Sequence, residues 1–299
     1  MDLINFSAVD VYVYQIILIN LVIAVGLLSG LRFVTGLVAN VDSAEELATR
    51  DNYAFGIAMA AGIVALALML TGAVSGEVGD TYLSEIVSVL SYGVLGVILI
   101  KVGRLIQDKF VLTGIRIQEQ IKSGNLAAAL VDAGNTLATG LVLRAVMLWV
   151  ESDTLNGLLV VLAAFVITQL LMALVSKYRV VVYARRHDGE SLQSVLEAGK
   201  VALAIRFLGH IIGVALAITA ASGVVAYQTE NLLMALLVWA LVALVFSILV
   251  SLIASIARNV VLYGIDVVEE VDNQNNVGVA AIEASISISI GLFFVALFV

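Results

Sequence analysis

The sequence of 299 residues contains no cysteine and no proline, and it has only two histidines. The absence of cysteine excludes disulfide bonds, iron–sulfur centres and zinc sites built from thiolates. Two histidines leave little with which to build a metal or catalytic centre, so we expect no cofactor and no metal. Average proline usage of about 5% would give roughly 15 prolines. The helices must therefore run without proline kinks, and we expect any irregularity to fall at glycine.

Charge is also scarce, because only 13% of the residues are charged while 62% are hydrophobic. A soluble domain carries about 25% charged and about 45–50% apolar residues. A chain this apolar cannot cover its surface with polar groups in water, so we predict an integral membrane protein embedded in a lipid bilayer. The net charge of −8 also argues against nucleic acid as a partner.

Apolar stretches long enough to cross a bilayer, which takes about 20 residues of helix, occur eight times in the sequence. They do not alternate apolar and polar residues as the strands of a membrane barrel do. We therefore predict an all-α membrane protein with eight spans, at residues 11–38, 53–74, 82–107, 126–150, 158–175, 201–226, 232–256 and 277–299.

The basic residues outside the spans fall on one side of the predicted membrane. They lie in or beside the connections that follow the first, third, fifth and seventh spans, and the connections after the second, fourth and sixth have none. Because lysine and arginine accumulate on the cytoplasmic side of membrane proteins, we place those four connections in the cytoplasm. Both termini are then expected outside.

The sequence also contains an internal repeat. Residues 124–133 match residues 275–284 at an offset of 151, and the carboxylates Asp132 and Glu283 fall at the same place in each copy. We predict two four-helix repeats, at residues 1–151 and 152–299, in one orientation because each has an even number of spans. Residues 51–58 resemble the same pattern, so each repeat is predicted to be a doubled two-helix hairpin.

The pattern Asn-x-Ala-x-Ala, or a near variant, begins the second, fourth and eighth spans at Asn52, Asn125 and Asn276. With the repeat arrangement, it resembles the bacterial membrane family called domain of unknown function 350 over nearly the whole chain. The resemblance implies an inner-membrane protein with no established activity, in the context of envelope stress, and a cytoplasmic stress-response protein as a partner. Lys200 replaces the asparagine at the sixth span, so the role of the asparagine is expected to be lost there.

Two interpretations of these span starts remain open. In the first, asparagine caps the helix N-terminus and the small residues let neighbouring helices approach closely. In the second, several helix N-termini converge and present N–H groups to an anion.

Ionisable residues within the spans are costly to bury in a membrane, and several lie at one depth. Counting along the helices at 1.5 Å per residue places them about 10 Å from the cytoplasmic ends of the fourth, sixth and eighth spans. We predict one polar layer here, in which Arg206 pairs with Asp132, Glu283 or both. Its members are Asp132, Asn135, Arg206, His210 and Glu283.

This layer has two readings. It is either a buried ion pair that fixes how the repeats dock, or a proton or ion site on a conduction path. Arg104 is interpreted as an anchor at the inner interface. The acidic stretch at residues 264–276 is either a solvated helix extension or a docking surface for a cytoplasmic partner.

The sequence argues against an enzyme, because it contains no nucleophile–base pair in a recognisable context, no metal-ligand cluster and no phosphate-binding glycine loop. The first functional hypothesis is a membrane scaffold or envelope-stress component that forms a homo-oligomer through its small-residue faces. The alternative is a channel or a proton- or ion-coupled transporter that uses the polar layer.

Overall fold

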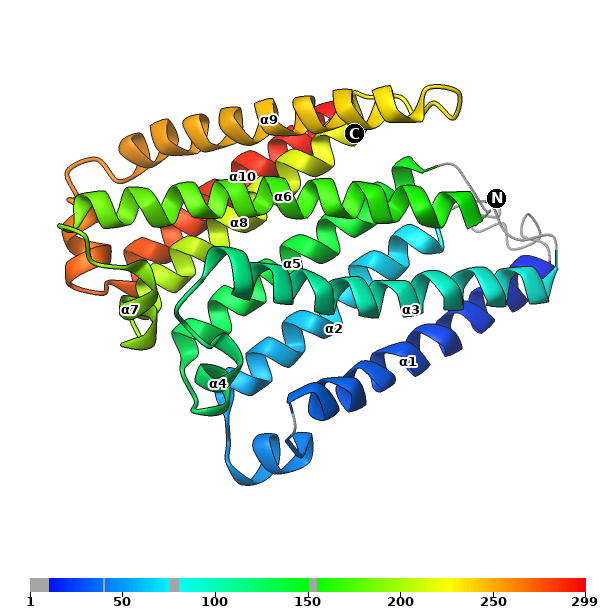
Figure 1. The fold of residues 1–299 in the computed structure, drawn as a ribbon, viewed down its shortest axis with the longest axis horizontal. Helices are drawn as coiled ribbons and strands as arrows, with labels where there is room; N and C mark the ends of the chain where they lie inside the picture. The colour runs from blue at the N-terminus through cyan, green and yellow to red at the C-terminus, as the bar shows by residue number, and fades with distance from the viewer. Residues whose placement is uncertain (1–10, 40, 76–80, 151–154) are drawn as a thin grey trace, which may run out of the picture.

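The computed structural model describes residues 11–39, 41–75, 81–150 and 155–299. Within them lie eight helices long and apolar enough to cross a membrane, as the sequence predicts (Figure 1). They are α1 (Val11–Ala39), α2 (Tyr53–Ala73), α3 (Tyr82–Ile106), α5 (Leu126–Trp149), α6 (Leu155–Arg186), α8 (Val201–Ser222), α9 (Leu232–Val261) and α10 (Val277–Phe298). The predicted boundary between residues 151 and 152 lies outside the described residues.

Two details of the helices differ from the expectation. Helix α6 runs on to Arg186, well past the predicted end at residue 175, because Lys177 and its neighbours extend the helix rather than end it. Arginines in its last turn complement the partial negative charge of the helix C-terminus. The end of the third span widens into a π-helical segment, η3 (Gln107–Val111), which contains no glycine. The prediction that irregularity falls at glycine is therefore wrong there, whereas α5 and α10 are continuous.

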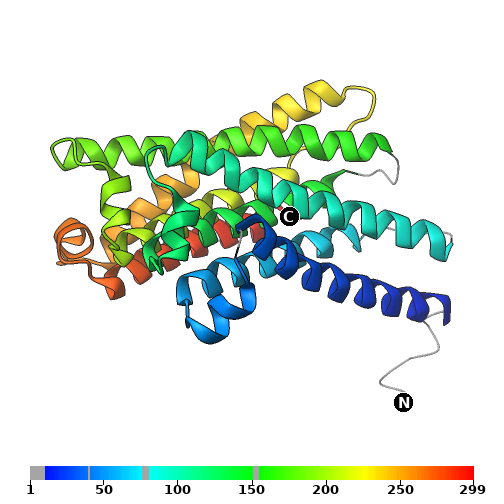
Figure 2. The same cartoon turned by 60° about the horizontal axis from the view of Figure 1, so that its bottom comes forward.

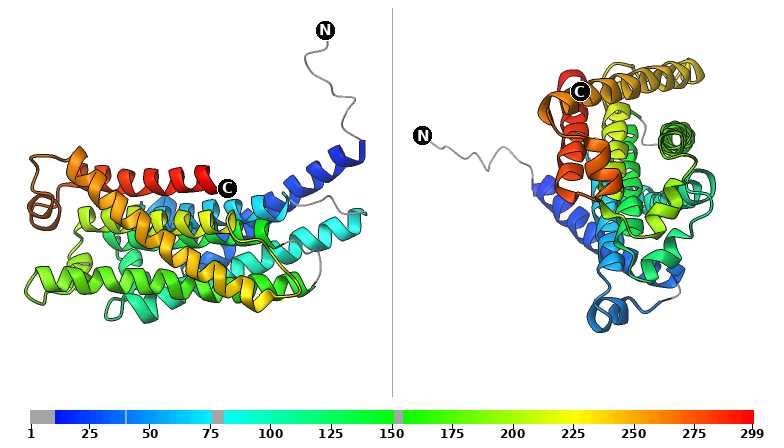
Figure 3. Two further views of the ribbon diagram at one scale, coloured as in Figure 1. Left: turned by 90° about the horizontal axis from the view of Figure 1, so that it is seen from above. Right: turned by 90° about the vertical axis from the view of Figure 1, so that its left-hand side faces the viewer.

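The second helix of each hairpin joins a row, in the order α2, α5, α8, α10 (Figure 3, right). We call these four the row helices. Glycine lets their backbones touch: a Cβ added at Gly134 of α5 would lie 2.9 Å from the Cα of Leu208 in α8. One added at Gly209 of α8 would lie 2.2 Å from the Cα of Ala284 in α10. Close approach at small residues is how membrane helices gain packing contacts.

The first helix of each hairpin covers this row, so we call α1, α3, α6 and α9 the cover helices. Helix α3 packs on α2 and α5, α6 on α5 and α8, and α9 on α8 and α10. Helix α1 packs on α2 and α3 and lies at one edge of the molecule (Figure 2). Each cover helix except α1 thus bridges its own row helix and the preceding one.

A short segment connects each cover helix to its row helix. These lead segments are η2 (Glu45–Thr49), α4 (Ile117–Lys122), α7 (Leu192–Glu197) and η4 (Glu269–Asn273). One residue with positive φ follows each lead segment, namely Asp51, Gly124, Gly199 or Asn275. The residue after it directly precedes the row helix. Glycine and asparagine adopt this backbone conformation most readily, so the doubled-hairpin repeat is visible in the backbone itself.

The close contact between α8 and α10 can be tested with Gly209→Ala. The added methyl group would overlap the backbone of Ala284, so the two helices must separate, and we expect a loss of about 1–3 kcal/mol. Unfolding of the purified protein in mixed detergent micelles measures this. The matched control is Gly56→Ala, whose Cβ meets only the Cδ2 of Leu47 at 3.5 Å. If both variants unfold alike, the close packing is incorrect.

Candidate functional site

The residue before each row helix is the point at which successive hairpins meet, and we call it the cap residue. At three of the four positions it is asparagine. The Oδ1 atoms of Asn52, Asn125 and Asn276 accept hydrogen bonds of 3.1–3.2 Å from backbone N–H groups three residues later. These bonds satisfy helix N-termini that otherwise have no partner. Asparagine therefore caps these helices, as the first interpretation expects.

The other side-chain atom of the cap residue reaches into the next hairpin. Asn52 Nδ2 donates to the carbonyl oxygens of Ile121 (3.1 Å) and Lys122 (3.3 Å), at the end of α4. Asn125 Nδ2 donates in the same way to the carbonyls of Leu196 (3.0 Å) and Glu197 (3.2 Å), at the end of α7. One asparagine thus caps its own helix and ties down the lead segment of the hairpin that follows.

Lys200 keeps half of this role. Its Nζ donates to the carbonyl of Asp272, 2.7 Å away in η4. Asp272 lies four residues before the next cap residue, which is the position that Ile121 and Leu196 hold in their own hairpins. The Lys200 side chain makes no cap bond. The N–H of Ala202 instead donates to Asn275 Oδ1 at 2.9 Å. The expectation that the asparagine's role is lost at the sixth span is therefore wrong for the bond to the next lead segment, which Lys200 makes. It is right for capping by the cap residue itself, because Asn275 caps α8 instead.

The intramembrane charges form two clusters rather than one layer. In the first, Arg104 of α3 forms an ion pair with Asp132 of α5 at 3.1 Å. It also donates to Thr136 Oγ1 (2.8 Å) and to the carbonyl of Ala58 in α2 (2.9 Å). Arg104 and Asp132 are only 9% and 3% exposed. One arginine therefore joins α2, α3 and α5 inside the first repeat.

The second cluster centres on Arg206 of α8. Its Nε pairs with Glu283 of α10 at 2.6 Å, and its Nη1 binds Asp272 of η4. Arg258 of α9 approaches the other oxygen of Glu283 at 3.4 Å, and His187 faces Asp272 at 3.3 Å. Five segments of the second repeat thus meet at two carboxylates, each only 2% exposed. They are α8, α9, α10, η4 and the turn that follows α6.

Of the two predicted partners of Arg206, Glu283 is confirmed and Asp132 is wrong, because Asp132 pairs with Arg104 instead. The other two predicted members are also separate from one another. The His210 ring shares a 2.9 Å hydrogen bond with Ser287 of α10. Asn135 is buried in α5, and its Oδ1 has no hydrogen-bond partner in the described structure. The two repeats therefore hold separate clusters, and no ion pair between them involves Asp132.

Arg104 and Asp272 are the residues whose importance the sequence analysis missed. Arg104 is turned into the bundle instead of anchoring the helix at the interface. A usable signal existed, since it shares a helix face with Gly93 and Gly96, and glycine on one face marks helix contact. Asp272 corresponds by repeat register to Ile121 and Leu196, both buried, so alignment with these two hairpins would have predicted its burial.

The acidic stretch is largely used within the chain. Asp272 is buried, Glu270 accepts from Asn276 Nδ2 at 2.7 Å, and Glu269 accepts from Asn273 Nδ2 at 2.5 Å. Among the residues that the structure describes, no group of three His, Asp or Glu side chains is placed to hold a metal ion. Asp266 also accepts from the backbone N–H of Val268, so all four carboxylates of this stretch have hydrogen-bond partners within the chain.

The doubled arrangement can now be compared with known proteins. The family described as Domain of Unknown Function (DUF350) matches the chain twice, over residues 8–147 and 153–298. The chain belongs to this family. Each match covers one four-helix repeat of this DUF350 protein, so the contact between α5 and α8 joins two family units. No curated protein and no solved structure matches the chain.

The first cluster can be tested by removing one or both charges. Arg104→Leu leaves Asp132 buried without its cation, and we expect a loss of about 3–5 kcal/mol in unfolding free energy. The double variant Arg104→Leu, Asp132→Leu should recover much of this loss, because two apolar side chains replace the pair.

The matched control is Arg116→Ala, whose ion pair with Glu119 is exposed, with side chains 81% and 64% accessible. Its stability should stay within about 0.5 kcal/mol of the parent. The single variant Asp132→Leu completes the comparison, and a double variant whose loss equals the sum of the two single losses would show that the pair is not coupled.

Proposed function

We propose that this DUF350 protein is an oligomeric scaffold of the bacterial inner membrane, with both termini outside, that acts in envelope stress through a cytoplasmic partner. Neither catalysis nor a cofactor is part of the proposal. Orientation rests on the basic connections, and the stress context on the family resemblance. The scaffold role rests on the packing of the bundle.

The observation that carries this proposal is the contact between row helices next to the charged clusters. Gly134 and Gly209 lie within one turn of the cluster level, and neither position has room for a methyl group. Arg206 and Glu283 are paired across the α8–α10 interface, where Gly209 lies. A row of helices in backbone contact, in which Asp132, Arg206 and Glu283 are each paired with an opposite charge, is suited to holding a shape.

A transport function is the second candidate, and one observation favours it. The Oδ1 of Asn135 and the Oε1 of Gln169 are buried without hydrogen-bond partners among the described residues. Gln169 Nε2 donates to Thr139 Oγ1 at 3.3 Å, and Thr139 lies three residues along α5 from Thr136, the acceptor of Arg104. An unsatisfied polar atom in a membrane costs several kcal/mol, so water or an ion at this place would be stabilised.

Reconstituted liposomes distinguish the two candidates. Proton, sodium and potassium flux is measured with the parent protein, with the double variant Asp132→Asn, Glu283→Gln, and with protein-free liposomes. The scaffold proposal predicts flux equal to that of empty liposomes in both protein samples. Flux through the parent that is abolished in a double variant that elutes as a folded protein would overturn it and establish transport.

A further inference from the structure

The row helices share a stripe of small residues that continues to the end of the row. Counted from each cap residue, positions 2, 9, 13 and 20 are Ala, Gly or Ser in all four helices. In α2, α5 and α8 all of these residues are buried, whereas in α10 all of them are exposed. The α10 members are Gly278, Ser285, Ser289 and Ala296.

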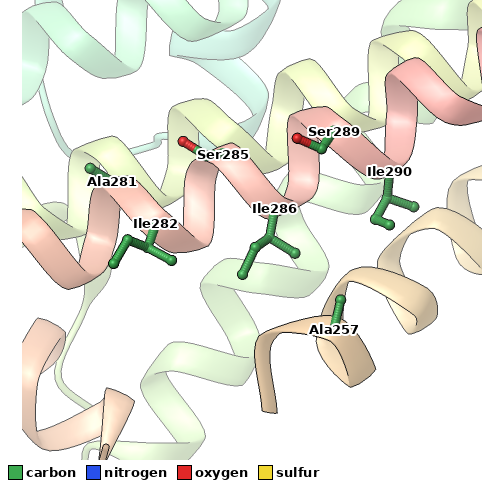
Figure 4. A pocket seen from close by; sticks show the side chains of 7 residues that line it. All are labelled: Ala257, Ala281, Ile282, Ser285, Ile286, Ser289 and Ile290. Atoms are coloured by element: carbon green, nitrogen blue, oxygen red, sulfur yellow. The ribbon is translucent and has the colours of Figure 1, made fainter. Parts of the chain in front are cut away.

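Inside the chain this stripe is the surface that receives the next row helix. Gly134 at position 9 of α5 meets Leu208 at position 8 of α8. Gly209 at position 9 of α8 meets Ala284 at position 8 of α10. In α10, Ser285 holds position 9, and the described chain has no further row helix to meet it. Figure 4 shows Ser285 and Ser289 pointing away from Ala257 of α9.

The cap residue of the last hairpin shows the same break in the pattern. Asn52, Asn125 and Lys200 each donate to a carbonyl at the end of the following lead segment. Among the described residues, Asn276 Nδ2 donates only to Glu270, within its own hairpin. By repeat register, its missing acceptors correspond to the carbonyls of Ala48 and Thr49 in η2.

At the opposite end of the row, α1 and α2 have an exposed surface that matches the exposed stripe of α10. In the described part of the chain, every other cover helix packs on two row helices, whereas α1 packs on α2 and on the cover helix α3. Its Gly26 and Gly30 form a GxxxG pair, a common membrane-helix contact. Both are exposed, and a Cβ added to either would meet nothing within 4 Å. On α2, Ala60 at position 8 is exposed, although its counterparts Ala133 and Ala284 are buried.

We propose that α10 of one copy docks against α1 and α2 of a second copy, continuing the row from molecule to molecule. Ser285 then meets Ala60, and Asn276 ties the lead segment η2 of the second copy. The two surfaces differ, so the contact is heterologous and builds a ring or an open array. The inference deepens the proposed scaffold, on which it rests, by naming its partner as a second copy of this chain.

Lipid alone would not explain the composition of the α10 stripe. The lipid-facing side of α9 is made of bulky residues such as Leu237, Leu241 and Leu252. The α10 stripe holds glycine, serine and alanine at the spacing that the buried interfaces use. The junction between α5 and α8, which joins the two family units, is built on this stripe. A third unit supplied by another copy therefore continues an existing interface.

Disulfide crosslinking in native membranes tests the array, and the chain is suited to it because it has no cysteine. The test variant carries Ser285→Cys and Ala60→Cys. Both positions are exposed, so the substitutions leave each copy folded. Oxidation should give a ladder of dimers, trimers and larger products. Co-expression of the two single variants should give dimers only, and each single variant alone should stay monomeric.

The matched control is Leu252→Cys with Ala60→Cys, because Leu252 is 56% exposed and lies at a comparable distance from the inner end of its helix. A ladder no stronger than that of the control would overturn the array. Dimers from Ser285→Cys alone would also overturn it, because they indicate a symmetric α10–α10 contact.

A second measurement places a bulky side chain on the α10 stripe and determines the mass of the oligomer. Ser285→Trp should convert the oligomer in lipid nanodiscs to a monomer, whereas Leu252→Trp should not change its mass. Equal masses for both variants would contradict the docking of α10. Ion flux through the parent would overturn the scaffold while leaving a crosslinked ladder in place. Silent liposomes without a ladder would overturn the array alone, so the two failures are distinguishable.

Discussion

The structure depends on the joint that each cap residue makes between its own row helix and the lead segment of the next hairpin. Helix ends leave backbone groups without partners, and an unsatisfied group is costly near the apolar part of a membrane. Asn125 meets both needs, since its oxygen caps α5 and its amide nitrogen binds carbonyls at the end of α7. The joint thereby fixes the register of neighbouring row helices. In that register, Gly134 and Gly209 contact the backbone of the next row helix.

The buried charges refine this arrangement. Arg206 lies six residues after Lys200. One of its carboxylate partners, Asp272, comes from η4, the lead segment that the Lys200 joint connects to α8, and the other, Glu283, comes from α10. Arg104 similarly joins three helices of the first repeat. Because removing two charges from water offsets much of their attraction, such clusters specify which surfaces dock more than they stabilise the fold. Their location within each repeat leaves the α5–α8 contact between repeats to the joint and the small-residue stripe.

Much of this arrangement could be predicted from the sequence, because it depends on patterns among residues that are close together in the chain. Apolar length located the eight helices, and the asparagine motif located three caps and the repeat. Counting residues also gave the depth of Asp132, Arg206 and Glu283 correctly enough to place them near one level. It could not give their partners, since depth does not fix the direction in which a helix face points. Asp272 was missed for a related reason: it lies in a π-helical turn, where the helical periodicity used to assign faces no longer holds.

The most direct measurement is the unfolding free energy of Asn125→Asp compared with Asn125→Ala. Aspartate caps a helix as well as asparagine does and its charge suits a helix N-terminus, but it cannot donate to the carbonyls of Leu196 and Glu197. If the joint holds the two family units together, Asn125→Asp loses stability much as Asn125→Ala does. Stability equal to the parent in Asn125→Asp would show that capping alone matters and would contradict the account.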